Sequence, residues 1–196
     1  MKYFIVGLGN PGEEYKNTRH NTGRIVASVA AKKFDATEWK TEKTMKALTA
    51  KGSHGKHSLI FLLPEGFMNN SGKSVAGFVK SKKDAERTVV IYDDLDLPAG
   101  SFKLSFNRGS GGHRGLDSVI RALKTREFVR IRIGISPVTP GGKIKKPQGE
   151  KKVQDFILGN FSDKETETLK KTAKRAVESI ETLVAEGREK AMSVSN

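Results

Sequence analysis

The sequence predicts an α/β fold: a single-domain, three-layer sandwich in which a twisted mixed β-sheet is flanked by helices. Short β-branched and apolar runs alternate along the chain with segments whose apolar residues recur at helical spacing. Two of the strand-like runs are separated only by a Gly/His/Ser turn at 52–57, so they must pair antiparallel and the sheet must be mixed. The length of 196 residues favours one domain.

The N-terminal elements follow from local pattern. Residues 3–8 are an apolar run ended by Gly and Pro, which is typical of a buried strand. A helix is expected over about 21–34, because apolar residues recur at i, i+1, i+4 and i+5 from Ile25. Residues 45–51 and 58–63 are then predicted to form the two strands of the hairpin.

The central elements continue the alternation. Asn70 and Ser71 are suitable caps for a helix that extends to about Val79. The β-branched run at 88–92 and the alternating run at 102–106 predict two more strands. A helix over about 115–125 and a strand over 129–135 follow them.

The C-terminal third begins with a segment that lacks regular periodicity. Residues 137–150 contain three Pro, three Gly and three Lys and are predicted to be a flexible basic loop. Residues 153–158 form a short amphipathic segment. A capping box that starts at Ser162 predicts a long helix to about Glu186, and 188–196 are expected to be a tail.

The charge of the chain is concentrated in one region. The formal net charge is +14, and residues 101–152 hold 13 Lys/Arg against 3 acids, a net +10. Such a local excess is expected of a protein that binds a phosphate backbone, although a solvated surface is the ordinary explanation of a single charge run. The excess spans several predicted elements, so we favour a polyanionic partner. Charge alone does not separate tRNA from mRNA, DNA or an acidic protein.

Composition excludes several classes of protein. No run approaches 18 apolar residues, which argues against a membrane span. The chain contains no cysteine, so a disulfide framework, a cysteine-based zinc finger and a thiol nucleophile are excluded. The N-terminal residues lack the pattern of a secretory signal. We therefore expect a cytoplasmic protein.

The run Gly7-Leu8-Gly9-Asn10-Pro11-Gly12 matches the G-x-G-x-x-G pattern of dinucleotide-binding folds. In those folds the glycine loop leads directly into a helix whose amides meet the pyrophosphate. Here Pro11 removes an amide donor, and a polar stretch delays the helix by about two turns. We therefore reject a nucleotide-binding oxidoreductase and expect no cofactor.

His20 and Asp93 are the candidates for chemistry. His20 lies between a strand end and a helix start, where open α/β sheets place their ligands. Asp93 begins a carboxylate cluster after an apolar run, which is otherwise explained by a capped turn or a divalent-ion site. A carboxylate that accepts from an imidazole N–H raises the basicity of the other ring nitrogen. Because no protein nucleophile is evident, the pair indicates general-base activation of water.

Two further segments offer polar groups for binding. Phe67, Met68 and Asn69 precede the expected helix at 70–79 and either contact a substrate or merely cap that helix. The glycine-rich run 109–115 leads into another helix, with Arg108 and Arg114 beside it. Its amides suit an anion, with a flexible turn as the alternative. His54 and His57 are predicted to be exposed turn residues, and no metal set is evident.

These motifs together resemble the bacterial peptidyl-tRNA hydrolase family over about residues 3–187. The segments that carry the resemblance recur in order: Gly7–Gly12 with Tyr15, Thr18–Gly23, Phe67–Gly72, Asp93–Pro98, Gly111–His113 and Arg130–Ile135. The resemblance implies a monomeric single-domain α/β hydrolase without metal or cofactor. Such enzymes cleave the ester between a peptide and the terminal ribose of tRNA, and so recycle tRNA from peptidyl-tRNA that was released prematurely.

The resemblance also implies a role for individual residues. His20 would activate water, Asp93 would orient His20, and Asn10 would hydrogen-bond the peptide part. The cleft near the terminal adenosine and peptide would be lined by Tyr15, Phe67, Met68 and Asn69. Binding of tRNA would use Arg132, together with the other basic candidates Lys103, Arg108 and Arg114.

The chain departs from the family pattern at several positions. Arg114 stands where the family usually has Asn, and Ser105 stands where a tRNA-contacting Lys is usual, with Lys103 as a substitute on the same face. The 137–150 loop is longer and more basic than the family suggests. Because Arg114 replaces an Asn thought to hold the water or the substrate, a non-catalytic RNA-binding relative of the same fold is the alternative function.

Overall fold

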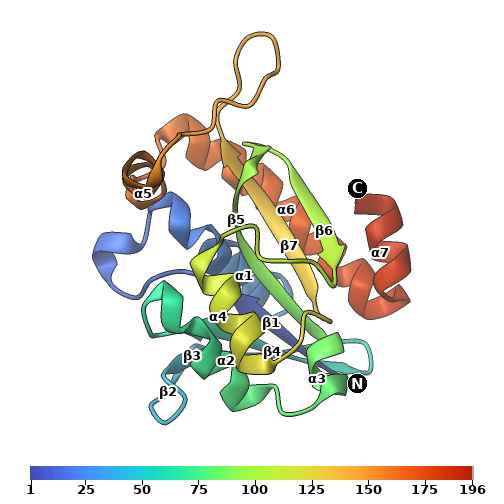
Figure 1. Ribbon diagram of the computed structural model, residues 1–196. Coiled ribbons are helices and arrows are strands. Elements are labelled where there is room, and N and C mark those ends of the chain that lie inside the picture. Colours follow the sequence, from blue (N-terminus) through green and yellow to red (C-terminus); the bar gives the residue numbers. More distant parts are fainter. Residues whose placement is uncertain (196) are drawn as a thin grey trace.

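A seven-stranded mixed sheet forms the middle layer of the protein (Figure 1). The computed structural model describes residues 1–195. The strand order is β2-β3-β4-β1-β5-β7-β6; β4, β1, β5 and β7 are parallel, while β2, β3 and β6 pair antiparallel. The strands are β1 (Lys2–Gly7), β2 (Lys40–Glu42), β3 (Ala47–His54), β4 (His57–Pro64), β5 (Thr88–Pro98), β6 (Phe102–Phe106) and β7 (Val129–Ser136). The predicted α/β fold is confirmed.

Helices cover both faces of the sheet and bury a separate apolar core on each (Figure 1). Residues of β1 alternate between the cores, with Ile5 in one and Phe4 and Val6 in the other, as a strand buried on both faces requires. One face is covered by α1 (Thr22–Lys33), α6 (Asp163–Glu186) and α7 (Arg188–Ser195). The other is covered by α2 (Ser71–Phe78), α3 (Lys82–Glu86) and α4 (Arg114–Leu123).

Several elements differ from the sequence-based prediction. The hairpin turn is only two residues long, so His57 belongs to β4 and is buried rather than exposed in a turn. The strand predicted to end at residue 92 continues to Pro98 as β5. The short elements β2 and α3 were not predicted.

The C-terminal segment also differs from its prediction. The residues expected to be a tail form α7 as far as Ser195, and Ala191 of this helix is fully buried in the core beside α6. Residue 196 lies outside the described part of the chain. The predicted capping box at the start of α6 is confirmed: Ser162 and Glu165 exchange hydrogen bonds.

The segment between β7 and α5 (Glu150–Leu158) projects from the sandwich (Figure 1). We call residues 137–149 the basic arm. It folds back on itself through a β-bridge between Val138 and Ile144 and returns at α5. Across the described residues, no helix is both long enough and apolar enough to span a membrane.

Helices α2 and α4 pack closely because a glycine lies at their crossing. A Cβ atom added to Gly72 would lie 2.0 Å from the carbonyl oxygen of Ser118 and 2.8 Å from Cβ of Ala122. The backbone N–H of Gly72 also donates to Ser118 Oγ at 2.9 Å. This contact fixes α4, and therefore the residues at the N-terminus of α4, relative to α2.

Substituting Gly72→Ala is expected to destabilise the protein by about 2–4 kcal/mol, because the helices must separate to admit the methyl group. Thermal unfolding should then occur about 5–15 °C lower. Gly109→Ala is the matched control, since its added Cβ would meet no atom within 4 Å. Equal melting temperatures for the two variants would contradict this account of the crossing.

Candidate functional site

The candidate site lies where the segments after β1 and within β5 meet the first turn of α4. Asn10 follows β1, and His20 lies in the short 3-10 helix η2 (Arg19–Asn21) just before α1. Asp93 belongs to β5, an interior strand of the sheet, and the extension of β5 through Pro98 also carries Asp94 and Asp96. His113 is the N-cap residue of α4. Parallel strands bring such segments together at their carboxyl ends.

His20 and Asp93 form a buried pair. Nδ1 of His20 lies 3.0 Å from each carboxylate oxygen of Asp93, and both side chains are almost fully buried. An ionised carboxylate only accepts hydrogen bonds, so Nδ1 carries the proton and donates it. Nε2 of the neutral ring therefore holds a free lone pair. His20 lines the cleft described below, where this lone pair is available to a water molecule.

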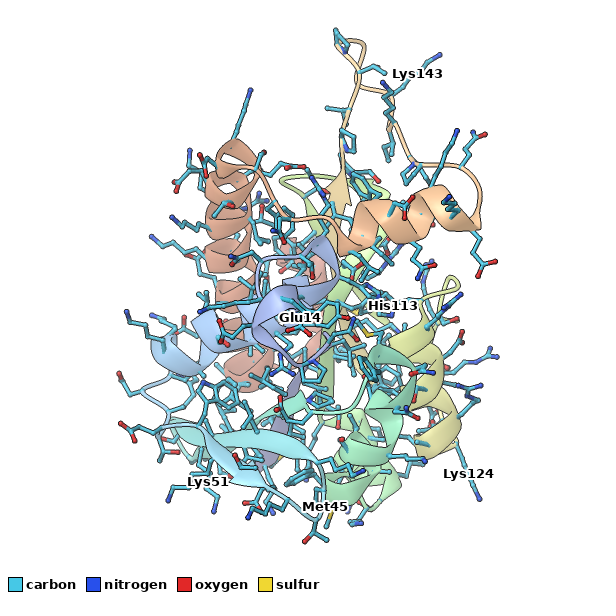
Figure 2. All side chains as sticks on the ribbon, turned by 90° about the vertical axis from the view of Figure 1, so that its left-hand side faces the viewer. Glu14, Met45, Lys51, His113, Lys124 and Lys143 are labelled. Atoms are coloured by element: carbon cyan, nitrogen blue, oxygen red, sulfur yellow. The ribbon has the colours of Figure 1, made fainter. Side chains whose placement is uncertain are left out.

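A second imidazole contacts the same carboxylate. Nε2 of His113 lies 3.1 Å from Oδ1 of Asp93, and Nδ1 of His113 accepts the backbone N–H of Leu116 at 3.2 Å. Because Nδ1 is an acceptor, the proton of the neutral ring must be on Nε2, which donates to Asp93. The ring also packs against those of Tyr92 and His20, with centroids 4.9 and 5.0 Å away. In Figure 2, His113 lies between α4 and α5.

The pKa values of Asp93 and His20 are both shifted by their surroundings. Burial acts to raise the pKa of Asp93, but the charges and hydrogen bonds of His20 and His113 outweigh burial and hold this pKa well below its usual range. Burial acts to lower the pKa of His20. The charge and hydrogen bond of Asp93 raise this pKa, and they outweigh both burial and a weaker lowering effect of the Arg114 charge. The pKa of His20 is therefore raised above 6.5. His20 is thus a stronger base than a free imidazole.

The other carboxylates of the β5 segment have partners of their own. Oδ2 of Asp94 accepts from Nε of Arg132 at 2.6 Å, and Oδ1 of Asp96 accepts from Nζ of Lys146 at 2.5 Å. The three acids of this run therefore avoid mutual repulsion by pairing with side chains from four different segments. Asp93 alone pairs with imidazoles, which distinguishes it from the cation-paired acids beside it.

Asn10 and Asn69 line the same cleft as His20. The side-chain oxygen of Asn10 accepts the backbone N–H of Met68 at 2.8 Å, and its main chain exchanges hydrogen bonds with the side chain of Asn21. This arrangement leaves Nδ2 of Asn10 as a donor toward the cleft, where none of the described residues accepts from it. Asn69 is exposed at the cleft with no partner for its amide among the described residues.

Met68 holds this side of the cleft to α4. It is buried in the apolar core, whereas the neighbouring Phe67 is 61% exposed. A Cβ atom on Gly115 would lie 2.3 Å from Sδ of Met68, so a glycine is required at this point of α4 for the thioether to pack. Phe67 therefore offers an aromatic face to a ligand, while Met68 sets the position of the loop that carries Asn69.

These groups open into one cleft of about 780 Å³. Most of the predicted site residues line it: Asn10, His20, Phe67, Met68, Asn69, Asp93, Arg108, Arg114 and Arg132. Two predicted residues do not. Tyr15 lies in the turn η1 (Glu13–Tyr15), outside the lining, and Lys103 is exposed on β6 opposite Arg132 without reaching the cleft.

The basic residues of the cleft differ in their partners. Arg132 is held by Asp94, and Arg114 pairs with Glu150 at 2.6 Å across the rim, between the first turns of α4 and α5. Both members of the latter pair are largely exposed, so the bridge contributes little stability. No described carboxylate pairs with the side chain of Arg108. Its carbonyl accepts from the buried guanidinium of Arg130, which anchors the glycine-rich loop before His113.

Sequence reasoning missed two parts of the site. His113 was read only as part of a glycine-rich anion loop, although its position immediately before a helix is the signal of a capping residue whose ring is fixed. The apolar wall formed by Val153, Ile157 and Leu158 of α5 was also missed. The amphipathic spacing of the predicted segment at 153–158 was the available signal for that wall.

Among the described residues, one group has potential metal-ligating atoms that all lie within 4.8 Å of one another: His20, Asp93 and His113. The nitrogens that would bind an ion are the same nitrogens that donate to the carboxylate. An ion at this point would have to displace both protons. The arrangement present is a hydrogen-bonded network around one carboxylate.

An α/β sandwich that holds a carboxylate-oriented histidine in a basic-rimmed cleft defines a class of hydrolase in which the base acts on water. A family model described as "Peptidyl-tRNA hydrolase" matches residues 4–196. The peptidyl-tRNA hydrolase of Herpetosiphon aurantiacus is 42% identical, covering 99% of this chain and 90% of the relative. That of Mycobacterium tuberculosis is 37% identical, covering 96% and 94%. This chain belongs to the peptidyl-tRNA hydrolase family.

A solved structure agrees with the sequence comparisons. The crystal structure of peptidyl-tRNA hydrolase from Acinetobacter baumannii superposes with a TM-score of 0.88 at 31% sequence identity. The match covers 99% of this chain and 94% of that chain. The fold described here is therefore that of the family over essentially its whole length.

Replacing Asp93→Asn is expected to lower the pKa of His20, because burial then acts without the opposing carboxylate charge. A base must be deprotonated to act, so kcat/KM rises with pH through the pKa of His20, which lies above 6.5 in the unmodified protein. In the variant the acidic limb of the pH profile should move to lower pH, and the plateau should fall about 100-fold or more.

Asp155→Asn is the control for this pH profile. Asp155 is exposed on α5 and lies outside the cleft lining, and its substitution removes the same charge. It should leave the acidic limb in place. A limb that stays unmoved in Asp93→Asn, or that moves upward, would contradict the assignment of the limb to His20.

Proposed function

We propose that this chain hydrolyses the ester bond between the peptide and the 3′-terminal ribose of peptidyl-tRNA, and so returns tRNA to use after premature release. The observation that carries the proposal is the His20–Asp93 pair, with Nδ1 held 3.0 Å from the carboxylate and Nε2 left free at the cleft. Such a pair activates water without a covalent protein intermediate.

The geometry supports a two-step proton transfer. Nε2 of His20 takes a proton from water as the oxygen attacks the ester carbonyl, and Asp93 stabilises the imidazolium that forms. The negative charge develops on the carbonyl oxygen, to which the amide of Asn69, a residue of the cleft lining, would donate a hydrogen bond. The tetrahedral intermediate then collapses, the ester bond breaks, and the imidazolium returns its proton to the departing ribose oxygen.

Asn10 is suited to bind the peptide part of the substrate. Its oxygen is already used by the N–H of Met68, so the side chain cannot rotate to exchange its donor for its acceptor without losing that bond. Nδ2 is thus a fixed donor for a peptide carbonyl. An unblocked aminoacyl ester lacks that additional carbonyl, which provides a basis for discrimination.

The basic rim supports binding of the tRNA part. Arg108 and Arg132 line the cleft, and Lys103 lies beside Arg132 on the adjacent strand. Arg114 is engaged with Glu150, so its contact with phosphate requires this exposed and weak bridge to open. We infer that the protein acts as a monomer, as the resemblance to the family implies, and that it acts in the cytoplasm, where its tRNA substrate is used.

His20→Ala is expected to reduce hydrolysis of an N-blocked aminoacyl-tRNA by about 10²- to 10⁴-fold, because the base is removed. Release of the blocked amino acid should be followed with a chelator present, and an unblocked aminoacyl-tRNA serves as the poor substrate for comparison. Full activity of the variant would refute the mechanism. Tight tRNA binding by the unmodified protein without any turnover would instead support the non-catalytic relative.

Asn10→Asp is expected to lower kcat/KM for the blocked substrate about 10-fold, which corresponds to the loss of one hydrogen bond to the peptide. The new carboxylate retains an oxygen for the N–H of Met68 but replaces the Nδ2 donor with an acceptor. Hydrolysis of the unblocked ester should change less, so the ratio of the two kcat/KM values is the measurement. An unchanged ratio would remove Asn10 from peptide recognition.

A further inference from the structure

We propose that the basic arm, residues 137–149, binds the sugar–phosphate backbone of the tRNA outside the terminal nucleotide held in the cleft. The inference rests on the proposed function, since it assigns a second contact for the same substrate. The arm would add a binding contact with the RNA outside the cleft. It would leave the hydrolytic step itself unchanged.

The base of the arm is fixed at the mouth of the cleft. The arm begins after the last residue of β7 and ends at α5, whose Val153 and Ile157 line the cleft. Near this base, Nζ of Lys146 donates to Oδ1 of Asp96 at 2.5 Å. The arm therefore adjoins one wall of the cleft, where it is within reach of a macromolecule whose end enters there.

The arm has a defined backbone shape. The N–H of Lys145 donates to the carbonyl of Pro137 at 2.8 Å, and the N–H of Thr139 donates to the carbonyl of Lys143 at 2.8 Å. The bridge between Val138 and Ile144 lies between these two bonds. The segment is thus a short two-stranded ribbon that holds Lys143 and Lys145 in a set geometry, which lowers the entropy lost on binding.

The charge of the arm is of one sign. Residues 137–149 contain three lysines and no acid; Glu150, the first residue of α5, pairs with Arg114, and Lys151 and Lys152 follow it. Lys146 pairs with Asp96, whereas no described carboxylate pairs with Lys143 or Lys145. Unpaired ammonium groups suit phosphates, which they neutralise with release of counterions and without reading base sequence. This chemistry fits a nucleic-acid backbone better than a protein surface of mixed charge.

The position of the arm indicates which part of the tRNA it meets. In Figure 2, Lys143 lies near the outer end of the arm, far above His113. Residues 137–139 continue the chain beyond Ser136, the last residue of β7, before the turn that begins at Pro140. A contact near Lys143 falls on the RNA outside the terminal nucleotide that carries the reacting ester.

The double variant Lys143→Gln/Lys145→Gln tests the proposal with two substrates. One is a full N-blocked aminoacyl-tRNA, and the other is the same blocked aminoacyl ester on adenosine alone, which is too short to reach the arm. We expect kcat/KM for the full tRNA to fall about 3- to 30-fold, mainly through KM. The slope of log(kcat/KM) against log salt should become shallower by about 1–2. Values for the short substrate should not change.

Lys171→Gln/Lys174→Gln is the matched control, because both lysines are exposed on α6, which covers the face of the sheet opposite to α4. It removes the same charge and should alter neither substrate's kinetics. The proposal is overturned if the arm variant and the control have the same tRNA kinetics and salt slope, or if the arm variant loses equally on both substrates. Failure of the proposed function is distinct: the unmodified protein would then hydrolyse neither substrate.

Discussion

The buried carboxylate of Asp93 is the constraint on which the site depends. A buried charge is stable only when hydrogen-bonded and paired, and Asp93 meets this requirement with two imidazole N–H groups. One imidazole comes from the turn before α1 and the other from the N-terminus of α4, which cover opposite faces of the sheet. Both helical layers must therefore be in place before His20 becomes an oriented base with a free Nε2. The two apolar cores thus serve the chemistry by fixing these two helices relative to β5.

The charged groups at the centre of the cleft and those at its rim have different roles. At the centre, one carboxylate raises the pKa of His20 and keeps its reactive nitrogen toward the cleft. At the rim, cations are either held by acids, as Arg132 is by Asp94, or have no carboxylate partner among the described residues, as with Arg108. Burial also raises the pKa of Tyr92 to about 12, so this neighbour of His113 remains neutral. The site therefore combines a reacting centre built on one buried carboxylate with a positive surround suited to a polyanionic substrate.

Sequence pattern predicted the fold class and the pairing of His20 with Asp93, because strand ends and helix starts are local signals that parallel topology brings together. It did not predict that β5 continues through Pro98, because an acid-rich run is typical of a turn when the residues that pair with its carboxylates are not known. Those partners lie far away in sequence: His20, Arg132 and Lys146 are 73, 38 and 50 residues from the acids they bind. For Tyr15 the local motif predicted a position in the cleft, but the fold leaves this residue outside the cleft lining. Helix α7 depends on burial of Ala191 against α6, which the sequence of the segment does not reveal.

The central claim is that Asp93 fixes His20 as a neutral base protonated at Nδ1, with its pKa raised. A pH titration of the His20 ring nitrogens and carbons by NMR tests this claim most directly, because it reads tautomer and ionisation in the intact protein. The account predicts a protonated Nδ1, a bare Nε2 in the neutral ring, and a titration midpoint above 6.5. A proton on Nε2 of the neutral ring, or a midpoint below that value, would contradict it.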